Sequence, residues 1–413
     1  MKKLGVFIFI YAFVFSTLNL QNFASWFISR ELGQLFLYLN LGLLLFASTI
    51  FIKGRRFFSK TVHSWVLFYV AYYIFGIIAC IKFDYFDYLL QSAAPLTYFM
   101  TFAIFLRHPK NRGYLLKTML ISFLIYCIFL IGLYHLGYDV DILGKPKWGV
   151  ERAEGLYGDA NNSALLAIIC FTLWFKFYHP RNGIKRIAVL SLIVYSLFLT
   201  FSTTGYLVFA LVFVGLNYKL FLKKKMIIAL PLVPLLLLGL VNLTSLAKPL
   251  QLKKVQMAKV ENIENLFSFN LEQVDSSGRT ELLTNLLQKV FESPFLGNGI
   301  GFGNELRGHN TIIGIWADAG IVPLVFFLLV LFTYLKNTLK LQEAQRHYML
   351  ALLLTLFIYM ISLQTVINQP YLVCLFVWMA FKIDYHVPEH KYIPYHKNER
   401  TIAPQSAEQP RNE

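Results

Sequence analysis

Long runs of apolar residues, separated by short polar stretches, recur along most of the 413-residue chain. Hydrocarbon cannot satisfy backbone polar groups, so a run of about 20 apolar residues is typical of a transmembrane helix. The pattern predicts about twelve such helices, at residues 4–28, 32–52, 62–81, 88–106, 114–135, 161–178, 187–203, 205–222, 226–244, 310–334, 348–366 and 370–386. We therefore expect an all-α polytopic membrane protein.

One long polar segment interrupts this pattern and divides the chain. Residues 1–244 carry the first nine predicted helices with short loops, residues 245–309 form one large extracytoplasmic loop, and residues 310–386 carry the last three helices. The polar, proline-containing tail, 387–413, is expected to be disordered cytoplasmic chain. Within the large loop, apolar residues at helical spacing predict an amphipathic helix over 280–292, which Pro294 ends. These apolar residues are Leu282, Leu283, Leu286, Leu287 and Val290.

Composition and charge agree with a membrane protein and exclude a nucleic-acid binder. Hydrophobic residues make up 57% of the chain and charged residues 15%. The net charge of +16 comes mostly from alternate loops on the side of the N-terminus, such as 53–56, 107–112 and 181–186. This distribution is the positive-inside bias, which places both termini in the cytoplasm and the large loop outside. The four cysteines fall inside apolar runs, so neither a disulfide framework nor a metal site is expected.

Candidate chemistry gathers in two predicted external loops. In the large loop, Arg279 and His309 each stand near the start of a predicted helix, where free N–H groups and the helix dipole favour an anion. In the loop 137–162, Arg152 could hold a phosphate, although, taken on its own, that loop is better explained as a solvated loop with interfacial aromatic residues. Asp84 and Asp87, in a third external turn, suggest either a cation site or an interfacial aromatic belt with solvated acids, and the belt is the more economical interpretation.

The order, spacing and placement of these pieces resemble the O-antigen ligase/polymerase family of bacterial envelope glycosyltransferases. The pieces that carry the resemblance are Arg152-Ala153-Glu154-Gly155 with Asn161-Asn162, Ser277-Gly278-Arg279, Pro294 to Gly301, and His309-Asn310 with Gly320. They cover residues 150–320, and the predicted topology extends the likeness over nearly the whole chain.

The resemblance implies a multi-pass enzyme of the GT-C type in the bacterial inner (plasma) membrane, with its active site facing the periplasm. It implies an inverting transfer from an undecaprenyl-diphosphate-linked glycan to a lipid A-core or to a growing glycan, without a cofactor or a metal. An arginine suits the diphosphate because it is permanently charged and bonds phosphate bidentately, and a histidine suits the acceptor proton. The diphosphate would be bound by Arg152, Arg279 and Arg307, and His309 would be the general base. The glycan would be contacted, or the loop shaped, by Asn161, Gly297, Gly299, Gly301 and Asn310, the glycines as a flexible turn.

One departure from the family pattern concerns the turn after the seventh predicted helix. Many relatives carry a Ser/Thr-Arg pair there, whereas this chain has Ser202-Thr203-Thr204-Gly205. One diphosphate contact expected from the resemblance is therefore either missing or supplied from elsewhere, for example by Arg307 or Lys289. The histidine favours a ligase, and a repeat-unit polymerase of the same family remains the alternative.

Functions of other classes make different demands on the sequence. A transporter or flippase of lipid-linked glycans would need charged residues inside the spans. The predicted spans are nearly free of charge, and Asp318 is the clearest exception. A structural partner in envelope assembly would need no cluster of histidine and arginine.

Overall fold

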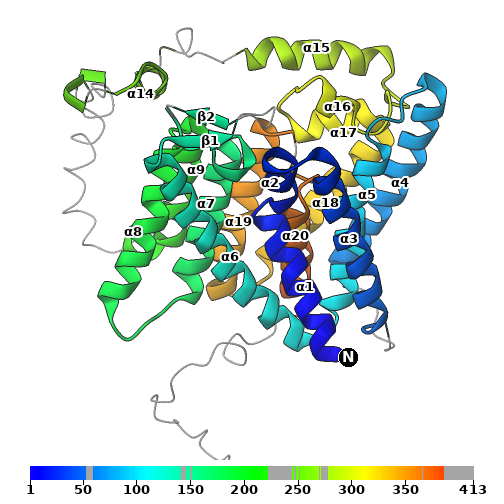
Figure 1. Cartoon of the computed structure of the whole chain (residues 1–413), viewed down its shortest axis with the longest axis horizontal. Coiled ribbons are helices and arrows are strands. Elements are labelled where there is room, and N and C mark those ends of the chain that lie inside the picture. The colour runs from blue at the N-terminus through cyan, green and yellow to red at the C-terminus, as the bar shows by residue number, and fades with distance from the viewer. Residues whose placement is uncertain are drawn as a thin grey trace, which may run out of the picture.

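The chain forms a bundle of α-helices in the computed structural model, which describes residues 1–52, 59–140, 146–148, 151–221, 244–245, 248–250, 252–268, 270, 278–364 and 366–385 (Figure 1). The first half contains α1 (Lys2–Thr17), α2 (Leu20–Phe27), α3 (Arg30–Thr49), α4 (Lys60–Phe83), α5 (Leu89–Phe105), α6 (Pro109–His135), β1 (Tyr138–Val140), β2 (Pro146–Trp148), the 3-10 helix η1 (Gly155–Tyr157), α7 (Ala160–Phe177), α8 (Gly183–Leu199), α9 (Thr203–Leu216) and α10 (Tyr218–Phe221). The second half contains η2 (Lys248–Leu250), α14 (Lys254–Phe267), α15 (Arg279–Glu292), α16 (Phe302–Glu305), α17 (Thr311–Ala319), α18 (Ile321–Leu339), α19 (Glu343–Ser362) and α20 (Pro370–Tyr385).

The helical class is as predicted, and among the described residues six helices are long and apolar enough to cross a membrane, or seven if the bent pair α1 and α2 counts as one span. The six are α3, α4, α6, α7, α18 and α19. Four further predicted spans form helices of 14 to 17 residues, namely α5, α8, α9 and α20. The ninth predicted span, 226–244, lies outside the described residues except for residue 244, and so does the whole tail, 387–413. The total of twelve spans and the GT-C type therefore stay predictions.

Two predicted spans are wrong as continuous helices. The first, 4–28, bends by 59° between α1 and α2, where Asn19 takes a left-handed φ of 49°. The bend is held by the segment before α7, because Asn19 donates to the carbonyl of Leu156 and the Tyr157 hydroxyl reaches the carbonyls of Ser16 and Thr17. The tenth, 310–334, breaks at Gly320 into α17 and α18.

The helices define two ends of the bundle, which we call the terminal end and the loop end. The terminal end holds the start of α1 and the end of α20, and there the Asp384 carboxylate accepts hydrogen bonds from Thr61 at the start of α4. The loop end, at the top of Figure 1, holds α2, the short β1–β2 hairpin and α14 to α17. The predicted external segments for which the structure describes residues lie at the loop end.

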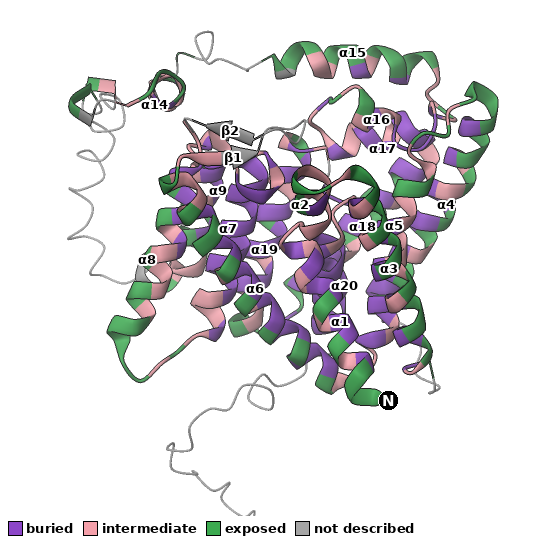
Figure 2. Ribbon diagram, in the orientation of Figure 1, coloured by how far each residue is buried: buried purple, intermediate pink, exposed green. Residues whose placement is uncertain are grey.

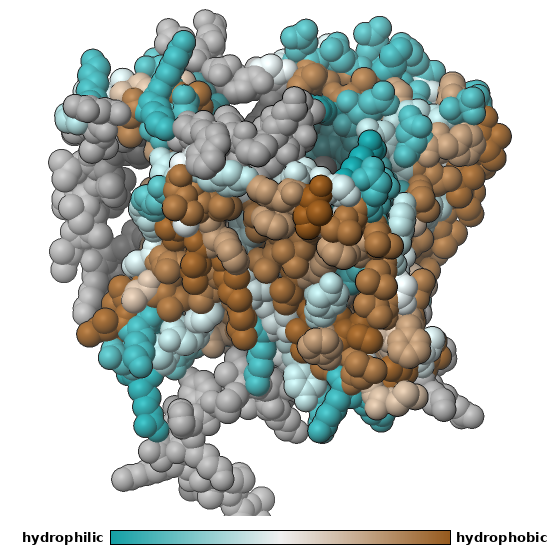
Figure 3. Space-filling model, viewed as in Figure 1, coloured by the Kyte–Doolittle hydropathy of each residue, from teal (hydrophilic) through white to brown (hydrophobic). Residues whose placement is uncertain are grey.

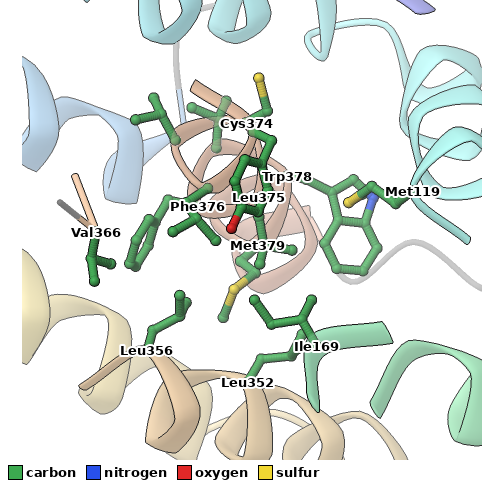
Figure 4. Close-up of a cluster of buried hydrophobic side chains, with 14 of the residues drawn as sticks. Met119, Ile169, Leu352, Leu356, Val366, Cys374, Leu375, Phe376, Trp378 and Met379 are labelled. Carbon is green, nitrogen blue, oxygen red and sulfur yellow. The ribbon is translucent and has the colours of Figure 1, made fainter. Parts of the chain in front are cut away.

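A tightly packed centre separates the two ends. Helix α20 is buried along almost its whole length. It packs against α1, α4, α5 and α18, and side chains of α6, α7 and α19 lie beside it (Figures 2 and 4). Trp378 of α20 is fully buried and donates its indole N–H to the carbonyl of Arg112 in α6, 3.3 Å away. Apolar residues cover the outside of the bundle between two more hydrophilic ends (Figure 3). Lipid is as apolar as these side chains, so close packing of this kind, rather than exclusion from water, holds the helices together.

Candidate functional site at the loop end

The glycine-rich segment lies against the end of α17. The amide of Asn298 donates to the carbonyl of Ala317 at 2.7 Å, and the amide of Gly299 donates to the carbonyl of Asp318 at 3.0 Å. A Cβ at Gly297 would lie 2.5 Å from the amide nitrogen of Ala319. These contacts bring two backbones together, and only residues without a Cβ allow that approach.

The same segment also packs against the turn between α4 and α5. A Cβ at Gly299 would lie 2.9 Å from the ring of Tyr85, and one at Gly301 would overlap the Cβ of Tyr88. Gly297, Gly299 and Gly301 have φ values of 78°, 118° and 85°, which L-residues rarely adopt. The predicted flexible turn is therefore a closely packed one, while a direct contact of these glycines with the glycan stays a prediction.

Asp318 fixes this arrangement from inside the protein. Its side chain is only 6% exposed, and its carboxylate accepts hydrogen bonds of 2.7 Å from the Tyr72 hydroxyl and from the amide of Gly303. The charged residue that the sequence places within a span thus joins α4 to the segment that precedes the histidine. In this structure Asp318 holds α4 and the segment around Gly303 together through these two hydrogen bonds.

Helix α15 covers the neighbouring loop, and its predicted amphipathic pattern is confirmed. Leu286 and Val290 are fully buried and form a cluster with Ala317 of α17. Gly308 packs so closely on Leu286 that a Cβ there would overlap the leucine side chain. Arg279 is the first residue of α15 and stands seven positions, about two helical turns, before Leu286 in the sequence.

The residues around His309 form a strained loop that leads into α17. Arg307 and His309 both have left-handed backbones, with φ values of 49° and 48°. Such conformations are uncommon outside glycine and concentrate at functional sites. Asn310 caps α17, because its side-chain oxygen accepts the amide of Ile313 at 3.0 Å. His309 is half-buried, whereas Arg307 is exposed.

The second group of candidates forms around Arg152. Its Nε donates to the carbonyl of Thr200 at 3.0 Å, and the amide of Ala153 donates to the carbonyl of Leu199 at 2.8 Å. Asn161 is buried at the start of α7, and its side-chain oxygen accepts the hydroxyl of Ser202 at 2.7 Å. The Arg152 loop, the start of α7 and the turn between α8 and α9 therefore meet.

Helix α14 packs next to this group. Gln256 donates from its side chain to the carbonyl of Glu151 at 2.6 Å and to the hydroxyl of Tyr134 at 3.0 Å. The Glu151 carboxylate in turn accepts the amide of Val255 at 3.1 Å. The polar segment that follows the ninth predicted span is thus anchored beside Arg152.

One short loop, between α19 and α20, joins the two groups. The hydroxyl of Thr311, two residues after His309, donates to the carbonyl of Leu363 at 2.5 Å. At the other side of the loop, Gln369 donates to the side-chain oxygen of Asn162 at 2.7 Å. The Arg152 group and the His309 group therefore border the same loop, although they are about 150 residues apart in sequence.

Sequence reasoning did not identify this connecting loop. Its available signal was the run of amide residues in a predicted external turn, Gln364, Asn368 and Gln369. Gln364 lies beneath Gly303 and Gly314, where a Cβ at either glycine would lie 2.6 Å from its Nε2. Its buried Oε1 has no hydrogen-bond partner among the described residues.

The remaining predicted candidates lie in different surroundings. Lys289, one of two suggested replacements for the missing arginine, pairs with Glu292 at 2.8 Å on the exposed side of α15. Tyr85, between Asp84 and Asp87, donates to Glu305 at 2.7 Å, and burial together with that carboxylate raises the pKa of the tyrosine well above its usual value. The aromatic residues of this turn thus pack on the glycine-rich segment. In the part of the chain that the structure describes, no three acidic, histidine or cysteine side chains are grouped to hold a metal ion.

The arrangement offers cations and an imidazole at one end of a membrane bundle, a combination that suits a phosphate-bearing substrate and the transfer of a proton. Comparison with known families gives a match to the model described as O-antigen ligase over residues 187–328, about a third of the chain. The matched range includes Arg279, the glycine-rich segment, His309 and Gly320, and it begins after Arg152. None of the curated proteins compared with the chain matches it.

Proposed function

We propose that the chain is a member of the O-antigen ligase family, whose model matches residues 187–328, and that it is a glycosyltransferase that transfers an undecaprenyl-diphosphate-linked glycan to an acceptor hydroxyl. The observation that carries the proposal is that the Arg152 and His309 groups border the same α19–α20 loop, from its two sides, at the loop end. We favour a ligase that uses a lipid A-core acceptor. The same arrangement also suits a polymerase that extends a growing glycan.

The donor needs no further activation in this proposal. Its anomeric carbon already carries a diphosphate, so the acceptor oxygen forms the new C–O bond as the bond to the diphosphate oxygen breaks. Undecaprenyl diphosphate leaves with the bonding electron pair, and the configuration at the carbon inverts. The protein must hold the leaving group, position the acceptor and take up its proton.

The charged residues at the loop end divide these tasks. Arg152, Arg279 and Arg307 bind the diphosphate, because a guanidinium carries a permanent charge and can bond two phosphate oxygens together. His309 accepts the hydroxyl proton. By capping α17, Asn310 fixes the backbone next to His309 and thereby the position of the histidine side chain.

Deletion of the gene, followed by separation of the surface glycans by size, tests the proposal. A ligase predicts intact long chains that stay on undecaprenyl diphosphate, and a polymerase predicts the accumulation of single repeats. Purified protein should then transfer glycan from the lipid-linked donor to the acceptor without other proteins. Unchanged surface glycans in the deletion strain and no transfer in the purified system would reject both forms of the proposal.

A transporter is the alternative of another class, and Asp318 bears on it directly. A transport pathway would place charged side chains where a polar substrate can reach them. The Asp318 carboxylate instead bonds Tyr72 and Gly303 and is buried, which supports surface chemistry over transport.

A further inference from the structure

A basic pocket lies at the terminal end of the bundle, away from the candidate catalytic residues. It has a volume of about 560 Å³ and is formed where the α7–α8 connection, the α9–α10 junction and the start of α19 meet. Five of its lining residues are lysine, arginine or histidine and one is acidic: Lys176, His179, Arg186, Lys219, His347 and Glu343.

The acidic residue, Glu343, is already in contact with its neighbours, including His347 at 4.0 Å. Glu343 pairs with Lys219 at 2.8 Å and accepts a hydrogen bond from the Tyr218 hydroxyl. Arg186, on the other side of the pocket, donates from Nη2 to the carbonyl of Phe175 at 2.8 Å. Its Nε is buried and has no hydrogen-bond partner among the described residues. Among the lining residues three lysine or arginine side chains thus stand against one carboxylate, and Arg186 has a buried donor that an anion would satisfy.

An apolar groove continues from this pocket along the outside of the bundle. The groove, about 430 Å³, shares Phe175 with the pocket and is otherwise lined by Phe171, Ile187, Leu190, Ser191, Val194, Tyr195, Phe198 and Phe213. From Ile187 to Phe198 it follows α8 for eleven residues, a length of about 16 Å. In the part of the chain that the structure describes, Ile187 and Phe198 are exposed, so the groove lies on the outside of the bundle.

We propose that the pocket and the groove together bind one anionic phospholipid, with its phosphodiester in the basic pocket and an acyl chain in the groove. A basic pocket between transmembrane helices recognises the headgroup by charge, and the groove receives the chain that is attached to it. A soluble anion would use the pocket alone, and ordinary lipid contact would use the groove alone. Because the basic pocket and the apolar groove are continuous, they favour a single molecule that has both an anionic headgroup and an acyl chain.

Native mass spectrometry of the purified full-length protein, titrated with phosphatidylglycerol or phosphatidylcholine, tests the site. The double variant Lys176→Gln/Arg186→Gln should bind phosphatidylglycerol roughly 30-fold more weakly, since each basic residue near a lipid surface contributes about 1 kcal/mol. The matched control is Arg181→Gln/Lys185→Gln, which removes two exposed charges from the same connection but none from the pocket. Equal weakening by the control, or equal binding of phosphatidylcholine by the unmodified protein, would overturn the proposal.

A second variant tests the groove separately. Ser191 is exposed, so Ser191→Trp should fill the groove without disturbing the core. It should weaken long-chain phosphatidylglycerol and leave a short-chain form unaffected. Loss of both forms to the same extent, or a preference of the unmodified protein for undecaprenyl phosphate over phosphatidylglycerol, would contradict the assignment to a bilayer phospholipid.

Discussion

Arg152 donates a hydrogen bond from Nε to the carbonyl of Thr200, 3.0 Å away, at the end of α8. The residue thereby stands beside the turn Ser202-Thr203-Thr204-Gly205, where many family members carry an arginine of their own. The two replacements suggested by the sequence were Arg307 and Lys289, and Lys289 is engaged with Glu292. The contact with Thr200 places Arg152, itself one of the proposed diphosphate ligands, beside the position of the missing arginine.

Arg152→Lys should lower kcat/KM of glycan transfer by about 10- to 100-fold. Lysine cannot reproduce the planar fork, and a charge-assisted hydrogen bond contributes about 1.5–3 kcal/mol. The measurement is transfer by purified protein, with melting temperature as a check on folding. Full activity of Arg152→Lys would rule out bidentate binding at this position.

An arginine placed in the turn tests whether a charge at this position can take over from Arg152. In an Arg152→Gln background, Thr203→Arg places a guanidinium where the family usually has one, and it should recover part of the lost kcat/KM. Thr203→Gln in the same background is the matched control and should recover none. Equal behaviour of the two double variants would show that charge at this turn does not matter.

His309→Ala should lose about 10²- to 10⁴-fold in transfer rate, the usual contribution of a general base, while the protein remains folded and inserted. His309→Gln separates the roles, because glutamine can hydrogen-bond a hydroxyl but cannot carry its proton away. His135→Ala is the control, since that histidine also lies at the loop end and bonds only Tyr195 among the contacts described. If His309→Gln equals the unmodified protein, the residue only positions the acceptor, and the base must be sought among Glu31, Asp84, Glu151, Glu154 and Asp159.

Local sequence patterns predicted the helices well because helix formation in a membrane depends on continuous apolar length. The pattern of α15 also succeeded, since Leu286 and Val290 recur at the spacing that buries one face. The bend at Asn19 and the break at Gly320 escaped prediction, because each depends on a partner far away in sequence. Asn19, for example, is held by Leu156.

The candidate site was predictable as a set of residues but not as an arrangement. Asn162 and Gln369, which share a hydrogen bond, are 207 positions apart, and no periodic pattern in the sequence predicts this pairing. The glycines were expected for their flexibility, yet Gly297 is required because the backbone of Asp318 and Ala319 leaves no room for a Cβ. Close approach between distant segments is a property of the fold, and composition alone does not specify the partner.

Gly320→Ala should destabilise the protein markedly. The strained backbone alone should lower the free energy of unfolding by about 1–3 kcal/mol. Gly320 has a φ of 82°, and an added Cβ would overlap the carbonyl of Phe295. Gly132→Ala is the control, because Gly132 lies within α6 with no atom within 4 Å of an added Cβ. Thermal unfolding in detergent should show a lower melting temperature for the Gly320 variant only; equal melting temperatures would contradict the packing described at the α17–α18 break.

Transfer by the purified protein should continue in EDTA, since the proposed mechanism uses arginines rather than a metal ion to hold the diphosphate. Asp84→Asn and Asp87→Asn should likewise have little effect. Activity that disappears with EDTA and returns with Mg²⁺ or Mn²⁺ would instead implicate these two aspartates. They neighbour Tyr85, which packs on the glycine-rich segment, so a metal there would lie close to the proposed site.

The proposed chemistry requires the loop end to face away from the cytoplasm, and cysteine labelling can determine its sidedness. Gln256 is buried, so the exposed Glu261 on the same helix is the better reporter for the loop end, and Lys340 serves for the terminal end. The four native cysteines are buried and free, which keeps background labelling low. A membrane-impermeant maleimide should label Glu261→Cys in intact spheroplasts and label Lys340→Cys only after permeabilisation, as the distribution of basic residues predicts. The opposite result would place Arg152 and His309 in the cytoplasm, where nucleotide-activated sugars are available. A lipid-linked diphosphate would then no longer be needed as the donor, and the proposal would lose its basis.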